Sequence, residues 1–267
     1  MNRLSHLLSP RGICPTIGIL AAIGLSTASA EIQSGELRIN SIQGTVTCST
    51  DHSAWFKAKP DLVLHSGAIL KTGSGSCADL VLDYSGTVLH MAPDSLLELA
   101  RLDKEMAGEN VVIDTSLNLK SGSIVGSQRK LAKPSKFEIT APGVVATIRG
   151  TEYAVCAAGG VTCFSGAVSI NYNSPNGSSV AAQVPAGCSF NPDSGKVLAT
   201  TPACLTSYSH DIDAVRECAQ QCKGACGPIE EPTCPISPHK PPPCKPPPPP
   251  PHHAGHGGDD GHGGNDR

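Results

Sequence analysis

Aromatic residues are scarce in this sequence, at 3% of 267 residues, so any hydrophobic core depends on valine, isoleucine, leucine and alanine. The scarcity also argues against a carbohydrate platform, because such platforms rely on stacked rings. Basic residues are few as well: 20 Lys and Arg stand against 23 Asp and Glu, which gives a net charge of -3. A chain without a basic stripe lacks the electrostatic footprint of a nucleic-acid-binding protein, so we expect no nucleic-acid partner.

Long hydrophobic runs are also missing. The apolar stretch from Ile13 to Leu25 is shorter than the roughly 20 residues that a membrane helix needs. It is accompanied by Arg3 and Arg11, and residues 28–30 (Ala-Ser-Ala) fit a signal-peptidase site. We expect residues 1–30 to be a cleaved signal peptide, the alternative being an uncleaved anchor. The mature protein is then expected in the periplasm or at the cell surface of a Gram-negative bacterium, with no membrane span.

Catalytic signatures are absent from the sequence. It contains no G-x-S-x-G, H-E-x-x-H or P-loop motif. His52, His65 and His90 are isolated, and we interpret them as surface or internally satisfied side chains. The sequence therefore predicts a protein that is not an enzyme and has no cofactor.

Cysteine is abundant for a chain of this length, with 12 residues, of which Cys14 lies in the expected signal peptide. This density is typical of disulfides in an exported protein. Cys218, Cys222 and Cys226 form a C-x3-C-x3-C pattern. We interpret them as disulfide partners that tie this segment to the rest of the chain; a structural zinc site is the alternative, although zinc ligands are usually spaced differently.

Residues 31–204 contain short, β-branched-rich apolar runs separated by glycine and serine. This pattern predicts an all-β domain, a sandwich or rolled sheet of Gly-rich hairpins. Small-residue pairs recur between the runs, and we expect hairpin turns at them because glycine tolerates a positive φ angle. These pairs are Ser66-Gly67, Ser85-Gly86, Ser121-Gly122, Ser165-Gly166 and Ala186-Gly187.

One hairpin is predicted in more detail, between Tyr153 and Phe164. A two-residue turn at Gly159-Gly160 would place Cys156 opposite Cys163. Opposed residues of antiparallel strands have Cα atoms about 4.5–5.5 Å apart, and a disulfide needs about 4.4–6.8 Å. We therefore expect a Cys156–Cys163 disulfide, the alternative being two thiols with different partners.

A cysteine-bearing helical segment is expected at 205–227, with the helix itself over 205–223. Ser209 is a plausible N-cap, Asp211 and Asp213 would lie in the first turn, and Gly224 would end the helix.

Residues 228–267 form a Pro/His/Gly-rich tail that offers almost no bulky apolar side chains, so we expect it to be disordered. Its clustered imidazoles predict weak binding of a divalent metal such as Zn, Ni or Cu. The candidate ligands are His252, His253, His256 and His262.

The segment from Ile139 to Val155 reads ITAPGVVATIRGTEYAV. It resembles the signature of the FecR domain family, t-P-x-g-x-x-x-v-R-G-T-x-f-x-V, and weaker matches extend the resemblance over residues 40–190. The signature residues Arg149, Gly150 and Thr151 are expected to form a bend between strands, so their role is structural.

The resemblance implies a non-enzymatic interaction or scaffolding module of the cell envelope, whose partner is an unknown envelope protein or polymer. Members that regulate sigma factors carry a sigma-binding segment and a membrane helix before the domain. Here a signal peptide is expected instead, which favours a stand-alone exported FecR-domain protein. Two other functions remain open: a periplasmic metal-binding protein that acts through the histidine tail, and a component of iron-linked envelope signalling.

Overall fold

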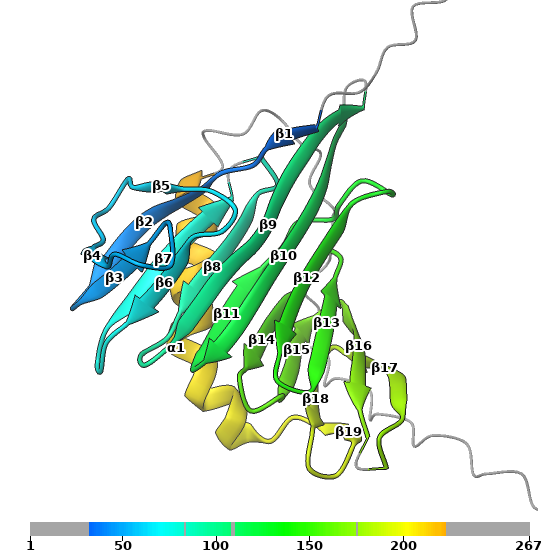
Figure 1. The fold of residues 1–267 in the computed structure, drawn as a ribbon. Helices are drawn as coiled ribbons and strands as arrows, with labels where there is room; N and C mark the ends of the chain where they lie inside the picture. Colours follow the sequence, from blue (N-terminus) through cyan, green and yellow to red (C-terminus); the bar gives the residue numbers. More distant parts are fainter. Residues whose placement is uncertain (1–31, 83, 108–109, 175, 223–267) are drawn as a thin grey trace, which may run out of the picture. The chain divides into compact units, whose positions relative to one another are not determined.

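The computed structural model describes residues 32–82, 84–107, 110–174 and 176–222. These residues form two sheets and one helix (Figure 1), which confirms the all-β prediction. The predicted signal peptide and the histidine tail lie outside the described residues.

The first sheet contains the longest strands, β9 and β10, which form a hairpin with register shifts between Ser116 and Leu117 and between Leu119 and Ser121. Strand β1 (Ile32–Ser34) adds to the outer part of β9. The order along the sheet is β17 (Ser179–Pro185), β16 (Ala167–Asn173), β13 (Val144–Ile148), β12 (Lys136–Ala141), β10 (Asn110–Ser121), β9 (Leu96–Ala107), β6 (Ile69–Thr72), β3 (Val46–Ser49) and β4 (Phe56–Lys57).

The second sheet is built from shorter strands. All its pairs are antiparallel, whereas the first sheet includes one parallel pair, β10 with β12. The order along the second sheet is β19 (Lys196–Ala199), β18 (Cys188–Asn191), β15 (Val161–Ser165), β14 (Glu152–Cys156), β11 (Ser123–Ser127), β8 (Thr87–Met91), β7 (Cys77–Leu82), β2 (Leu37–Gln43) and β5 (Val63–Leu64).

The chain crosses repeatedly from one sheet to the other, and most of the predicted hairpin corners are in fact these crossings. Of the five, only Gly86 lies between two strands of one sheet. Gly122 joins β10 to β11 with a φ of 75°, and a β-carbon there would collide with Ser95. The Ser95 hydroxyl donates to the carbonyl of Ser123 and accepts from its amide, at 3.1 and 3.0 Å. The glycine pairs therefore predicted where the chain turns, but they did not predict whether the next strand lies in the same sheet or in the other one.

The core between the sheets is aliphatic, as the scarcity of aromatics requires. Side chains alternate inward and outward along each strand, so that Val144, Ala146 and Ile148 of β13 all face the core. Tyr153 and Phe137 are its largest fully buried side chains. Inward faces from both sheets meet in this one cluster, which makes them two layers of a single domain.

Helix α1 (Pro202–Cys222) begins three residues earlier than predicted. Thr201 is the N-cap, since its hydroxyl accepts a hydrogen bond from the amide of Cys204 at 3.2 Å, and Pro202 occupies the first helical position. Ser209, the predicted N-cap, lies inside the helix and donates to the carbonyl of Thr206. Neither Asp211 nor Asp213 is in the first turn. Within the part of the chain that the structure describes, we find no helix with the length and hydrophobicity needed to cross a bilayer.

Helix α1 packs on the outer face of the second sheet, against β7, β8 and β11. A second apolar cluster, separate from the main core, holds it there. This cluster contains Val81, Val88, Val125, Ala154, Ile212, Val215 and Cys218.

Candidate functional site

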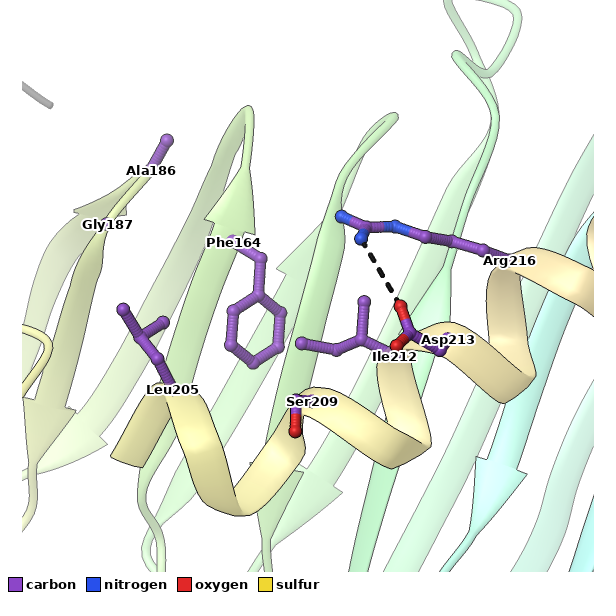
Figure 2. Close-up of a pocket in the computed structure, with 8 residues that line it drawn as sticks. All are labelled: Phe164, Ala186, Gly187, Leu205, Ser209, Ile212, Asp213 and Arg216. Carbon is purple, nitrogen blue, oxygen red and sulfur yellow. Dashed lines mark ion pairs between the residues drawn. The ribbon is translucent and has the colours of Figure 1, made fainter. Parts of the chain in front are cut away.

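A groove of about 440 Å³ lies beside the N-terminal half of α1 (Figure 2). We call it the α1 groove. Its walls are mostly apolar and come from α1, from β15 and from the corner between β17 and β18. The lining residues are Phe164, Ala186, Gly187, Leu205, Ser209, Ile212, Asp213 and Arg216.

The groove exists because the helix is sealed against the sheet only over part of its length. Val215 of α1 packs against the sheet and is 1% exposed, whereas Leu205, near the start of the helix, is 42% exposed. Between them the rings of Tyr208 and Phe164 meet edge to face, with centroids 5.9 Å apart. Phe164 and the exposed Leu205 both line the groove.

The charged rim of the groove is neutralised within the chain. Arg216 donates from Nε and Nη2 to the two carboxylate oxygens of Glu152 at 3.1 and 2.7 Å, and its Nη1 lies 3.8 Å from Asp213. The hydrogen bonds to Glu152 raise the pKa of the Arg216 guanidinium. What the groove offers a ligand is therefore chiefly apolar surface beside a fixed ion pair.

A second polar cluster lies beneath the helix. His90 of β8 is buried, with Nδ1 2.7 Å from Asp79 Oδ1 and Nε2 3.7 Å from Asp211 of α1. Ser41 donates to the other oxygen of Asp79 at 2.5 Å. A hydrolytic triad would place the serine against the imidazole, but here the serine binds the carboxylate. The cluster fastens α1 to β7 and β8.

The thiol of Cys77, near this cluster, is not activated. Burial, together with the negative charges of Asp79 and Asp211, raises the pKa of Cys77. A raised pKa keeps the sulfur in the thiol form, which is the poor nucleophile.

The signature residues lie at a crossing between sheets. Gly150 joins β13 to β14 with a φ of 79°. Arg149 donates from Nη2 to the carbonyl of Lys133 at 2.7 Å, and Thr151 is buried. The three residues therefore lie at a bend, and none of them lines the α1 groove.

The predicted pairing of Cys156 with Cys163 is wrong. Cys163 lies opposite Tyr153, because β14 and β15 are joined by the longer loop 157–160, and Cys156 is the last residue of β14. Both thiols are free. Cys188, which faces Cys163 from β18, is disulfide-bonded to a different cysteine.

The four histidines predicted to bind metal fall outside the described residues. Within the described ranges, no group of three or more His, Cys, Asp or Glu side chains is arranged to hold a metal ion.

The groove was missed by the sequence analysis, although a signal for it was present. Leu205, Ser209, Ile212 and Arg216 follow one another at intervals of four, three and four, which places them along one helical stripe. That stripe shows which helix face forms a wall. It does not show that β15 supplies the opposite wall.

Comparison with known proteins gives a family match and remote structural matches. Residues 68–169 match the family model described as FecR protein. Two crystal structures, each of a proposed anti-sigma factor from Parabacteroides distasonis, are 13% identical to the chain, with TM-scores of 0.38 and 0.36. The matches cover 52% of this chain and 63% of the first structure, and 50% and 59% for the second, so this chain spans less than two thirds of either one. No curated protein matches the chain.

Proposed function

We propose that this chain is a non-enzymatic module that binds another component of the bacterial cell envelope, on the basis of the match of residues 68–169 to the FecR family model. The domain match is the observation that carries the proposal. Export through the predicted signal peptide, residues 1–30, would deliver the module to that compartment.

The chemistry of the described polar groups supports binding over catalysis. Arg149, Arg216 and His90 are each engaged by a carbonyl or carboxylate of the same chain. Catalysis needs a nucleophile, base or donor aimed at open space where a substrate can react. These groups serve to fix elements in place.

The α1 groove is the binding surface in this proposal. Phe164, Leu205 and Ile212 present apolar surface, and binding sites are generally concave, mostly apolar and framed by a few fixed polar groups. The partner is then expected to insert one or two apolar side chains beside the Asp213–Arg216 ion pair.

The test is site-specific photocrosslinking in cells that express the protein. A photoreactive phenylalanine replaces Leu205, which lines the groove, or Leu198 of β19, which is 53% exposed and does not. We expect a discrete adduct from position 205 and none from position 198. Ser209→Trp, which would fill the groove, should abolish the adduct. Equal crosslinking from both positions, or none from position 205, would contradict the proposal.

The nature of the adduct also separates the alternatives. A membrane-anchored signalling protein as partner would favour iron-linked envelope signalling, a role in keeping with the FecR domain. A soluble or polymeric envelope component would favour scaffolding.

A further inference from the structure

The free edges of the two sheets differ in how they are protected against pairing. Strands β4 and β5 have two residues each, and β19 has four with a lysine at its start. Strand β17 has seven residues, Ser-Val-Ala-Ala-Gln-Val-Pro, with no charge and with proline only at its last position. Natural edges are usually kept short, charged or interrupted, because an open strand edge is a template for another strand.

The backbone of β17 is also regular. Its register with β16 runs without a shift from Ala167 opposite Pro185 to Asn173 opposite Ser179. A β-bulge would have twisted the edge away from a partner, and none is present in this pair. Among the described residues, no strand pairs with β17 on its other side, where it ends the first sheet (Figure 1).

The side chains of β17 leave the core partly uncovered at this edge. Val184 is buried in the main core cluster, and Ala182 packs against that cluster but is only half-buried, as is Val180. Ser179, Ala181 and Gln183 point to the other face and are exposed. A further strand beside β17 would cover the valine and alanine side chains and would use the open backbone groups.

We propose that this further strand is β17 of a second copy of the chain, paired antiparallel about a two-fold axis at Ala182. In this register all seven residues are paired. Val180 of one copy lies opposite Val184 of the other, on the core face. Ala181 lies opposite Gln183 on the exposed face, and Ser179 lies opposite Pro185.

A second copy fits this edge because an uncharged strand can meet its own image without like-charge repulsion. The valine pairs continue the apolar face across the axis, so the two cores join along one sheet. Closed two-fold dimers are the commonest assembly of soluble proteins. Contact through one strand edge is small, and interfaces below about 1,200 Å² are typical of weak complexes. We therefore expect a reversible, concentration-dependent dimer.

The test is sedimentation equilibrium of the exported full chain and two variants. In A181K/Q183K, each lysine faces a lysine of the other copy, and we expect the dissociation constant to rise about tenfold or more. In A181K/Q183E, each lysine faces a glutamate, and we expect the dimer to return and to weaken with added salt. Both positions are exposed. Unchanged melting curves would therefore show that neither variant impairs the fold.

A monomeric wild-type protein would overturn the proposal. This holds also if β17 of that monomer crosslinks to a different protein. Equal dimerisation of both variants would place the interface elsewhere, and loss of the dimer in both would overturn the register about Ala182.

Discussion

Tyr153 is the largest fully buried side chain among the residues that the structure describes. Its hydroxyl has no hydrogen-bond partner among the described residues, and burial raises its pKa. The ring lies on Gly126 of the neighbouring strand, where a β-carbon would meet the ring and its hydroxyl. We expect Gly126→Ala to lower the free energy of unfolding by about 1–3 kcal/mol, because the ring cannot move away.

The matched control for this substitution is Gly73→Ala. A β-carbon at Gly73 would have its nearest neighbour at 3.4 Å, an ordinary contact, and its φ is not in the left-handed region. Urea unfolding should show a small change for Gly73→Ala and a large one for Gly126→Ala. Similar values for the two variants would show that the ring of Tyr153 has room to adjust.

The same tyrosine supports a second prediction at this scale. Tyr153→Phe removes a buried hydroxyl that makes no hydrogen bond, so the free energy of unfolding should stay the same or rise by about 1 kcal/mol. Thermal or urea unfolding measures this directly. A clear loss of stability would reveal a partner for the hydroxyl, such as a buried water.

The error at Cys156 and Cys163 shows the limit of prediction residue by residue. A Gly-Gly pair suits a two-residue turn, but the loop is longer, and Gly159 alone carries a positive φ, of 89°. The local sequence is compatible with both loops. Packing decides between them, since the observed register buries Tyr153 and Val155 in the core.

Among the structural elements, α1 depends on a few buried contacts with the second sheet. Val215 is 1% exposed and packs with Val81, Val88 and Val125. We expect Val215→Ala to reduce the free energy of unfolding by about 2 kcal/mol through lost burial and a residual cavity. Hydrogen exchange of the helix amides should accelerate as well. Leu205→Ala, at an exposed position of the same helix, should change stability by less than about 0.5 kcal/mol.

The sequence predicted the strands better than the helix start. Runs such as 78–82 and 136–139 lie within β7 and β12, because short apolar runs bounded by turn-forming residues are typical of strands. At the helix two N-cap signals compete, Thr201-Pro202 and Ser209. The earlier one prevails, since proline at the first helical position loses no hydrogen bond and the additional turns place Tyr208 on Phe164.

For the molecule as a whole, the pattern of short apolar runs predicts the fold class, but it does not predict the order in which the strands pair. The parallel pairing of β10 with β12 and the crossings at glycine corners depend on contacts between residues far apart in the chain. The α1 groove is of the same kind, because Phe164 and Leu205 are brought together only when the helix docks. The local sequence can therefore indicate the helix residues that line such a groove, but it cannot indicate which strand lies opposite them.

The histidine tail supplies the last prediction, which concerns metal binding. Replacing His252, His253, His256 and His262 with asparagine should abolish binding of Ni or Zn in calorimetry, because imidazole is the ligand that these ions would use there. The melting temperature should not change, since the tail sequence offers almost no apolar surface to a core. His239→Asn is the control, outside the cluster, and should retain binding. If metal binding persists in the fourfold variant, the metal binds instead at Cys218, Cys222 and Cys226. A fall in melting temperature would instead show that the histidines contact the domain.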